Sequence, residues 1–315
     1  MDPELWQLLK DVSRSFYLSI RFLPGSIRPV IALGYLMARA SDTIADANAL
    51  EAANRLEILN QWRAQLFGLD AILKRGLLSC AERQPAGPER QLLEHIDKVL
   101  DCINQLSPAD QTLLLEVLRH IMRGQALDIE RFELAGSLRA LQSPEELEEY
   151  IYLVAGSVGE FWTKVCLQAW TRYSPLDSQK ILALGIEYGK GLQLVNILRD
   201  FPQDLQLGRS YLPVAGAIST DPKTVDPLFQ HWRLVALRYL ESGAQYVRSI
   251  RPTRVRFACA LPVLIGIETL DKMRTAPLAG QKIKVSRNRV YQLMLRSLLI
   301  AIIPGVDQLS RRPRP

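Results

Sequence analysis

Two pairs of aspartates repeat one spacing in distant parts of the chain. Asp42 and Asp46 lie four residues apart, and so do Asp200 and Asp204. An α-helix places residues at this spacing on one face, where like charges repel unless a cation lies between them. A single pair is more often a solvated polar stripe. Two pairs in apolar surroundings favour Mg²⁺, which binds carboxylate oxygens together with the phosphate oxygens of a substrate.

Polar and cationic side chains accompany these pairs. Asn196 precedes Asp200 by four residues and Gln193 lies one turn earlier, so a helix brings all three to one face. Fixed positive charge for phosphate oxygens can come from three nearby arginines, Arg39, Arg199 and Arg209. We therefore expect the two acidic faces to meet across a helix-lined cavity and to bind a diphosphate through Mg²⁺.

A proline interrupts the second pair. Pro202 removes a helical hydrogen bond and disfavours the helical conformation at Phe201. The sequence therefore predicts that the helix kinks or ends here, and that Asp204 is displaced from the face that carries Asp200.

The elements that would position these residues are helical almost throughout. Apolar residues recur at three- and four-residue spacing, and the pairs Ser107-Pro108 and Ser143-Pro144 are typical of helix starts. There is no alternating strand pattern, no GxGxxG and no P-loop, and we interpret residues 70–90 as a loop. The sequence predicts one all-α domain over residues 1–315, with helices near 28–48, 50–68, 91–105, 109–124, 145–173, 177–201, 226–250, 255–273 and 288–301.

Composition argues against several kinds of site. The four cysteines form no CxxC and the three histidines lie far apart, so neither a zinc site nor a Ser/His/Asp triad is expected. The N-terminal residues lack the basic start of a signal peptide, and no stretch approaches the ~20 apolar residues that span a bilayer. We therefore expect a cytoplasmic protein with reduced cysteines, present as a monomer or a weak dimer.

Positive charge gathers towards the C-terminal end. The chain has a net charge of +6, whereas the residues from Arg248 onwards hold 14 Lys and Arg against 3 Asp and Glu. Such a segment can face anionic lipid head groups, a phosphorylated substrate or a nucleotide, and it can equally be a solvated surface. No nucleic-acid recognition motif accompanies the charge, so nucleic acid is not an expected partner, while peripheral membrane contact stays open.

Five ordered motifs resemble those of the squalene/phytoene synthase family and extend over almost the whole chain. They are Ser13–Tyr17 (SRSFY), Arg39–Asp46 (RASDTIAD), Tyr150–Gly159 (YIYLVAGSVG), Gln193–Asp204 (QLVNILRDFPQD) and Gly208–Pro213 (GRSYLP). Any one of them would be weak, but five in order are specific. The resemblance implies an all-α isoprenoid synthase fold with helices around a central cavity. It also implies a prenyltransferase that joins two farnesyl diphosphates head to head.

The resemblance implies roles for individual residues. The Mg²⁺ ligands would be Asp42, Asp46, Asn196, Asp200 and Asp204. The catalytic residues beside the reacting carbons would be Tyr150, Arg39 and Tyr35. The substrate would contact Ser13, Ser15, Phe16, Arg39, Gln193, Arg199, Arg209, Val154 and Gly156. From the residues alone, Tyr150 can equally be a core tyrosine, and Gly156 can simply allow close helix packing.

Two features favour squalene as the product. Asp42-Thr43 and the stretch Phe257–Leu270 (FACALPVLIGIETL) resemble squalene synthases. The resemblance implies ionisation assisted by Mg²⁺, presqualene diphosphate as the intermediate and hydride from NADPH as the last step. The NADPH phosphate would bind the basic residues Lys282, Lys284 and Arg287. The alternatives are a non-reductive phytoene or dehydrosqualene synthase, a presqualene diphosphate synthase, and a non-catalytic assembly protein.

Overall fold

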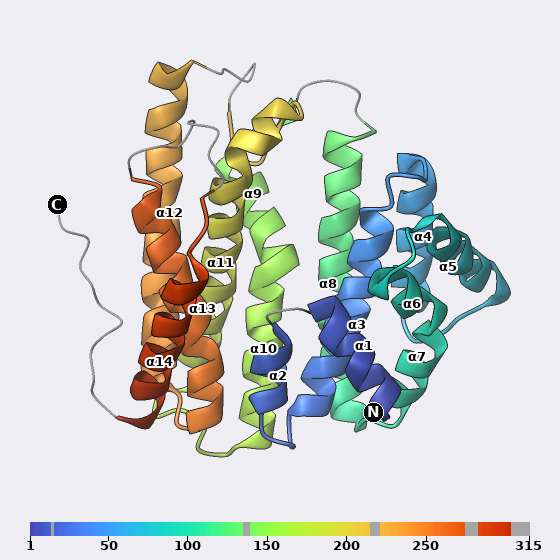
Figure 1. The fold of residues 1–315 in the computed structure, drawn as a ribbon, viewed down its shortest axis with the longest axis horizontal. Coiled ribbons are helices and arrows are strands. Elements are labelled where there is room, and N and C mark those ends of the chain that lie inside the picture. The colour runs from blue at the N-terminus through green and yellow to red at the C-terminus, as the bar shows by residue number, and fades with distance from the viewer. Residues whose placement is uncertain (14–15, 135–138, 215–220, 275–282, 304–315) are drawn as a thin grey trace. The chain divides into compact units, whose positions relative to one another are not determined.

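The computed structural model describes residues 1–13, 16–134, 139–214, 221–274 and 283–303, with the side chains of residues 16, 18, 139 and 222 left out (Figure 1). The chain divides into two compact units, residues 1–136 and residues 137–315. Each unit has its own buried apolar core. The single domain expected over residues 1–315 stays a prediction.

The first unit is made of helices. Its longest members begin with proline in their first turn, because proline has no amide hydrogen to leave unpaired there. Helix α3 packs against α4, α7 and α8, and its buried face includes Leu33, Leu36 and Met37. The helices are α1 (Pro3–Ser13), α2 (Phe16–Phe22), α3 (Arg28–Ala45), α4 (Ala52–Gln65), α5 (Ala71–Arg83), α6 (Pro88–Glu94), α7 (Ile96–Asn104) and α8 (Pro108–Phe132).

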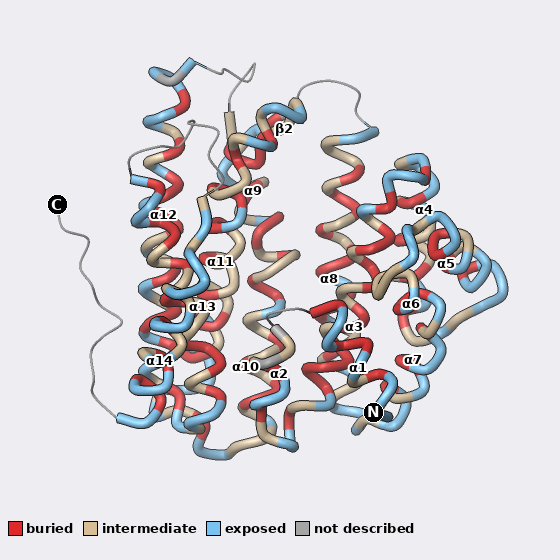
Figure 2. Tube along the Cα trace, viewed as in Figure 1, coloured by how far each residue is buried: buried red, intermediate tan, exposed pale blue. Residues whose placement is uncertain are grey.

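The second unit is built around one long helix, α11, which packs along α10, α12 and a π-helical turn, η1 (Figure 1). Two-residue strands β1 and β2 pair in parallel, with Arg139 opposite Arg209. Figure 2 shows buried and exposed positions alternating along α12, as expected for helices with one apolar face. The elements are β1 (Arg139–Ala140), α9 (Pro144–Ile151), η1 (Tyr152–Gly156), α10 (Ser157–Ala169), α11 (Ser178–Gln206), β2 (Arg209–Ser210), α12 (Pro222–Ser249), α13 (Thr253–Lys272) and α14 (Arg287–Ile302).

Glycines bring the helices of the second unit into close contact. A Cβ on Gly159 of α10 would lie 2.0 Å from the carbonyl oxygen of Gly185 on α11, and a Cβ on Gly189 would lie 2.2 Å from that of Ala155. No side chain fits at such distances, so these positions hold α10 and η1 directly against the backbone of α11. Helix packing therefore explains Gly159.

The all-α class predicted from the sequence is confirmed, with the short β1–β2 pair as a local addition. The loop predicted over residues 70–90 is wrong, because α5 and α6 occupy most of it. Asp70 caps α5 by accepting a hydrogen bond from the amide of Leu73 (2.7 Å). Leu73, Leu77 and Cys80 then form a buried helical face.

One helix in the described ranges, α11, is long and apolar enough to cross a membrane. Half of its most apolar window (50%) is buried within the protein. The helix also carries Arg199, Asp200 and Asp204. A buried core helix passes the same test of length and composition, so this finding is weak support for a membrane span.

Candidate active site

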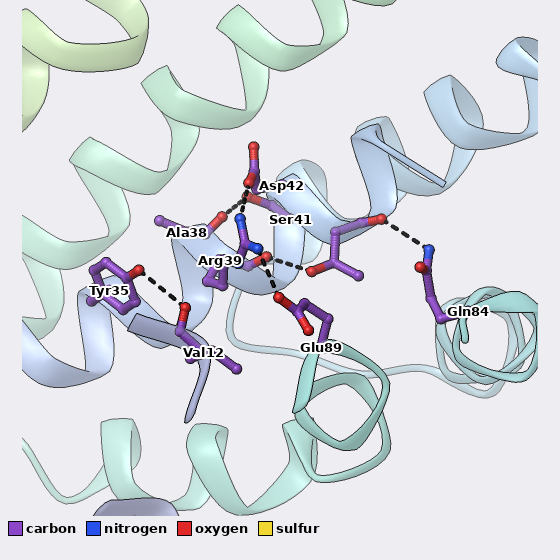
Figure 3. A network of polar contacts seen from close by, with 9 residues as sticks. Val12, Tyr35, Ala38, Arg39, Ser41, Asp42, Gln84 and Glu89 are labelled. Carbon is purple, nitrogen blue, oxygen red and sulfur yellow. Dashed lines mark hydrogen bonds and ion pairs between the residues drawn. The ribbon is translucent and has the colours of Figure 1, made fainter. Parts of the chain in front are cut away.

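Arg39 joins two helices of the first unit at the first aspartate pair. Its guanidinium, on α3, donates to Asp42 (Nη1–Oδ2, 2.7 Å) and to Glu89 of α6 (Nη2–Oε1, 2.8 Å) (Figure 3). The three side chains are between 29% and 42% exposed, so they lie at the edge of the core and reach solvent. A carboxylate and a guanidinium are thus presented together, which suits a metal-bound phosphate group.

The negative charge of Asp42 is unfavourable where it lies. Burial raises the pKa of Asp42 to about 6, the charge of Asp46 adds to the rise, and Arg39 opposes it. Although 42% of the side chain is accessible, the surrounding protein still removes enough water to disfavour the carboxylate. An additional cation would relieve this repulsion, so the oxygen donors of this pair fit Mg²⁺.

The number of ligands also fits Mg²⁺ delivered with a substrate. The described residues contain no group of three or more His, Cys, Asp or Glu that could hold a metal ion. Mg²⁺ commonly takes only one or two protein carboxylates, with water and substrate phosphate oxygens at its remaining positions. A pair of aspartates is therefore sufficient, whereas a structural zinc site would need four nitrogen or sulfur ligands.

The C-terminal end of α3 is held by a buried arginine that the sequence did not single out. Arg55 of α4 is 3% exposed and donates to the carbonyl oxygens of Ala45 and Leu50. The same guanidinium pairs with Glu133, just after α8 (Nη1–Oε1, 3.1 Å). These contacts fix the turn that follows α3, and Asp46 is the first residue of that turn.

The second aspartate pair lies on α11 with one arginine on each carboxylate. Arg199 donates to both oxygens of Asp200 (2.9 and 2.6 Å), and Arg209 of β2 donates to Asp204 (Nε–Oδ1, 2.9 Å). Asp204 is only 5% exposed. Burial raises the pKa of Asp204, and Arg209 opposes that rise.

The same residues line a cavity of about 440 Å³ in the second unit. Its walls combine two carboxylates with three cationic side chains, which suits an anion held partly through a metal ion. The lining residues are Arg199, Asp200, Gln203, Asp204, Arg209, Ile283 and Lys284.

The helix does not end at Pro202. Helix α11 continues to Gln206, so Asp204 lies in its last turn and the predicted helix end is wrong, whereas the predicted kink and the displacement of Asp204 stay predictions. The sequence around the proline is held by tertiary contacts, since Phe201 is buried and packs against Phe229 of α12 (5.8 Å between ring centroids). Asn196 and Gln193 lie earlier on α11, where Asn196 is exposed. Their roles as metal ligand and substrate contact stay predictions.

Tyr150 lies at the end of α9 and stacks on Tyr211, with ring centroids 5.1 Å apart and 29° between the planes. The guanidinium carbon of Arg209 lies 5.7 Å from the centroid of the Tyr211 ring. Arg209 thus contacts both the carboxylate of Asp204 and the ring of Tyr211, and Tyr211 in turn stacks on Tyr150. The aromatic contact is compatible with a core role and with a role beside a carbocation, so the catalytic role of Tyr150 stays a prediction.

The π-helical turn η1 follows Tyr150 directly and contains Val154 and Gly156. It is tied to α11 by Lys190, whose ammonium nitrogen lies 2.9 Å from Glu148 of α9 and 5.9 Å from the ring centroid of Tyr152. A Cβ on Gly156 would meet the side chains of Tyr152 and Lys190 at 3.0 and 3.2 Å. Close packing thus accounts for Gly156, and substrate contact by Val154 and Gly156 stays a prediction.

Other predicted residues lie at the N-terminal side of the first unit. The hydroxyl of Tyr35 is 3.5 Å from the carbonyl oxygen of Val12 (Figure 3). Ser13 is buried, and its hydroxyl donates to the carbonyl of Leu9 within α1. Ser15 and the side chain of Phe16 lie outside the described residues.

The three cations predicted to bind NADPH do not form one cluster among the described residues. Lys284 lines the cavity of the second aspartate pair, Arg287 is exposed in the first turn of α14, and Lys282 lies outside the described residues. Cations at these two described positions fit a phosphate group, and Lys284 is equally placed for a diphosphate.

A family model described as squalene/phytoene synthase matches residues 9–289. The chain is 28% identical over 321 residues to a squalene synthase of Cyberlindnera jadinii, covering 98% of this chain and 69% of that protein. It is 27% identical over 307 residues to the squalene synthase ERG9 of Saccharomyces cerevisiae, covering 93% and 66%. It is 28% identical over 289 residues to the Botryococcus squalene synthase of Botryococcus braunii, covering 85% and 58%. The chain thus spans between about half and two thirds of these proteins.

Two solved structures share the fold. TcSQS in complex with the ligand E5700 has a TM-score of 0.71 at 20% identity, covering 95% of this chain and 87% of that one. The squalene synthase HpnC from Alicyclobacillus acidocaldarius has a TM-score of 0.59 at 18% identity, covering 88% and 97%. At these identities the likeness speaks for the fold alone, and it confirms the isoprenoid synthase class predicted from the motifs.

Proposed function

Because this chain belongs to the squalene/phytoene synthase family of prenyltransferases, we propose that it condenses two farnesyl diphosphates head to head through presqualene diphosphate to squalene. The observation that carries the proposal is the pairing of aspartate with arginine on α3 and again on α11. Each unit therefore offers carboxylates for Mg²⁺ and guanidinium groups for diphosphate oxygens.

The first chemical task is the ionisation of an allylic diphosphate. Mg²⁺, when bound, supplies positive charge to the diphosphate oxygens. Within its own unit, Arg39 on the one hand and Arg199 with Arg209 on the other can donate hydrogen bonds to diphosphate oxygens, and such positive charge stabilises a pyrophosphate as it leaves. In the structure these arginines pair with Asp42, Asp200 and Asp204. Each arginine would therefore exchange a carboxylate partner for diphosphate oxygens when substrate binds.

The second task is to protect the carbocation left by the departing diphosphate. Water would quench it, so the reaction needs an apolar surrounding. Tyr150 and Tyr211 offer stacked aromatic faces, and an aromatic face attracts a cation by roughly 0.5–2 kcal/mol. We propose that Tyr150 acts beside the reacting carbons, together with Tyr35.

We further propose that NADPH completes the reaction, with its phosphate bound by Lys284 and Arg287. A synthase that makes phytoene or dehydrosqualene, or stops at presqualene diphosphate, would share the aspartate pairs and need no hydride. A non-catalytic assembly protein would have no use for two sets of Asp–Arg pairs. We place the protein in the cytoplasm as a monomer or weak dimer.

The test is a product assay with purified protein, farnesyl diphosphate and Mg²⁺, with and without NADPH. Squalene is expected only when NADPH is present, and presqualene diphosphate should accumulate without it. A conjugated triene that forms regardless of NADPH would instead identify a non-reductive synthase. Asp42→Asn and Asp200→Asn should each abolish pyrophosphate release. Full activity in either variant would refute the metal assignment, and no release by the unmodified protein would support the assembly protein.

A further inference from the structure

The outer face of α14 carries a continuous apolar stripe. Its residues follow the spacing of one helical face and are between 44% and 65% exposed. The stripe consists of Tyr291, Leu295, Leu298, Leu299, Ile302 and Ile303. These are six of the thirteen large apolar side chains that are exposed in the described residues, and the other seven are scattered over several elements. Contiguous exposed apolar surface of this kind marks an interaction site.

The stripe is not needed to hold α14 in place. The opposite side of the helix, with Leu293, Ser297, Ile300 and Ala301, is buried, and α14 packs on α13. At the end of α14 the guanidinium of Arg256 donates to the carbonyl of Ala301 (3.2 Å), which ties the two helices together. A helix that is apolar on both sides but covered on only one has a second surface available for a partner.

Positive charge borders the stripe at both ends. Helix α14 contains Arg287, Arg289 and Arg296 and no acidic residue, although Arg289 pairs with Glu268 of α13 (2.9 Å) and so adds little net charge. Arg287 is exposed in its first turn. Arg251, just before α13, and Arg254, in its first turn, are both exposed, and the Arg256–Ala301 hydrogen bond joins α13 to the last turn of α14. The surface therefore combines apolar side chains with arginines, as interfacial helices that bind anionic membranes do.

We propose that the α14 stripe docks on the surface of a bilayer that contains anionic lipids, with the helix lying in the plane of the interface. Charge complementarity selects this occupant. A second copy of the chain would bring an equally basic face against the stripe, and like charges oppose such pairing. The residues after Ile303 are also basic, with Arg311, Arg312 and Arg314 against Asp307, so their charge does not favour covering the stripe.

Co-sedimentation of the full chain with lipid vesicles tests this proposal. Vesicles of phosphatidylcholine alone are compared with vesicles that also contain phosphatidylglycerol. We expect about five-fold more bound protein on the phosphatidylglycerol vesicles, and a loss of that preference at about 1 M NaCl, where charges are screened. Equal and negligible sedimentation with both kinds of vesicle would overturn the proposal.

Variants assign the binding to the stripe. The double variant Leu295→Gln/Ile302→Gln should reduce binding to the anionic vesicles about ten-fold or more, because two of the most exposed apolar side chains of the stripe are lost. Arg251→Gln/Arg254→Gln should remove only the preference for phosphatidylglycerol. The matched controls are Ile72→Gln, at a position as exposed as Leu295, and Arg75→Gln, both on α5. Binding by the stripe variant that equals that of Ile72→Gln would overturn the proposal.

Light scattering and a shortened chain distinguish the other occupants. A dimer that the stripe variant converts to a monomer would mean that a second copy covers α14. Vesicle binding that appears only in a chain ending at Ile303 would mean that the following residues cover it. Either result would overturn docking on a bilayer. Circular dichroism checks that each variant is folded, and the single variant Leu295→Gln repeats the test if the double variant is not.

Discussion

The guanidinium of Arg55 is bound to the carbonyl of Ala45, the residue immediately before Asp46. Arg55 is buried, whereas its carboxylate partner Glu133 keeps 37% of its side chain exposed. An exposed carboxylate can be solvated when its partner is lost, but the buried carbonyl oxygen of Leu50, to which Arg55 also donates, cannot. The end of α3, which carries Asp42 and is followed directly by Asp46, therefore depends on one side chain from α4.

We expect Arg55→Met to lower the free energy of unfolding by about 2–3 kcal/mol, since it leaves buried polar groups without their donor. It should also raise the Mg²⁺ concentration needed for half-maximal activity, because the turn that begins with Asp46 is released. Urea unfolding and Mg²⁺ titration of the product assay measure the two effects. Arg75→Met, on the exposed face of α5, is the control and should change neither. An unchanged Mg²⁺ requirement in a destabilised Arg55→Met protein would show that the contact is structural only.

Glu89 holds the second nitrogen of the Arg39 guanidinium. We expect Glu89→Gln to weaken a charge-assisted hydrogen bond and lower kcat/KM about ten-fold, which corresponds to ~1.4 kcal/mol. The melting temperature should change little, since the pair is partly exposed. Glu94→Gln is the control, because Glu94 lies on the same helix but pairs with Arg90. Equal losses of kcat/KM in both variants would contradict a specific role for Glu89.

Gly159 admits no side chain beside Gly185. We expect Gly159→Ala to lower the free energy of unfolding by about 1–3 kcal/mol or more, because backbone rather than a flexible side chain must move. Gly25→Ala is the control, since a Cβ there would meet nothing within 4 Å. Chemical denaturation of the two variants makes the comparison, and equal midpoints would contradict the close contact between α10 and α11.

Stability should fall at alkaline pH because of a buried cluster in the second unit. The hydroxyl of Tyr173 is 2.8 Å from that of Tyr246, and Tyr246 is 3.0 Å from Thr163. Burial raises the pKa of Tyr173 and of Tyr246 well above 10, and raises the pKa of Cys166 to about 12. The unfolded thiol and phenols ionise near 9 and 10, so their contribution is complete below pH 9 and is lost as the pH rises further.

Between its unfolded and its folded pKa, each such group lowers the free energy of unfolding by about 1.4 kcal/mol per pH unit. Urea midpoints measured at increasing pH above 9 should therefore fall steeply. Tyr246→Phe should make the fall shallower, whereas Tyr291→Phe, at an exposed position, should leave it as it was. A midpoint that does not change with pH would contradict the neutral buried cluster.

Local patterns in the sequence predicted most helices and singled out the two aspartate pairs, whose role in binding a metal stays a prediction. Apolar periodicity predicts a helix because the residues of its buried face lie only three or four positions apart in the sequence. Ser107 and Ser143, each followed by proline, both cap helices as expected. The prediction failed at α5, where Gly76 and the proline-rich stretch after it resemble a loop. Asp70 and the buried face of Leu73 and Leu77 override those signals.

Partners from distant parts of the chain could not be predicted in this way. Glu89 lies 50 residues from Arg39 and Glu133 lies 78 residues from Arg55, so no spacing rule connects them. Tyr211 could have been singled out from the sequence, since it belongs to the GRSYLP motif. Its stacking on Tyr150, however, is visible only in the folded structure. The helix end predicted at Pro202 was wrong for the same reason, because packing of Phe201 against Phe229 outweighs a missing hydrogen bond.

The π-helical turn η1 makes α9, η1 and α10 one uninterrupted rod with a locally wider winding. Such a turn accommodates one residue more than regular winding would, and each residue of an α-helix advances the azimuth by about 100°. Removing one residue within Tyr152–Gly156 would therefore swing Tyr150 around the rod axis relative to Gly159. Tyr150 would leave Tyr211, and Glu148 would leave Lys190. The number of residues in this segment therefore determines the direction in which the Tyr150 side chain points. A one-residue deletion would disrupt its packing more than most substitutions would.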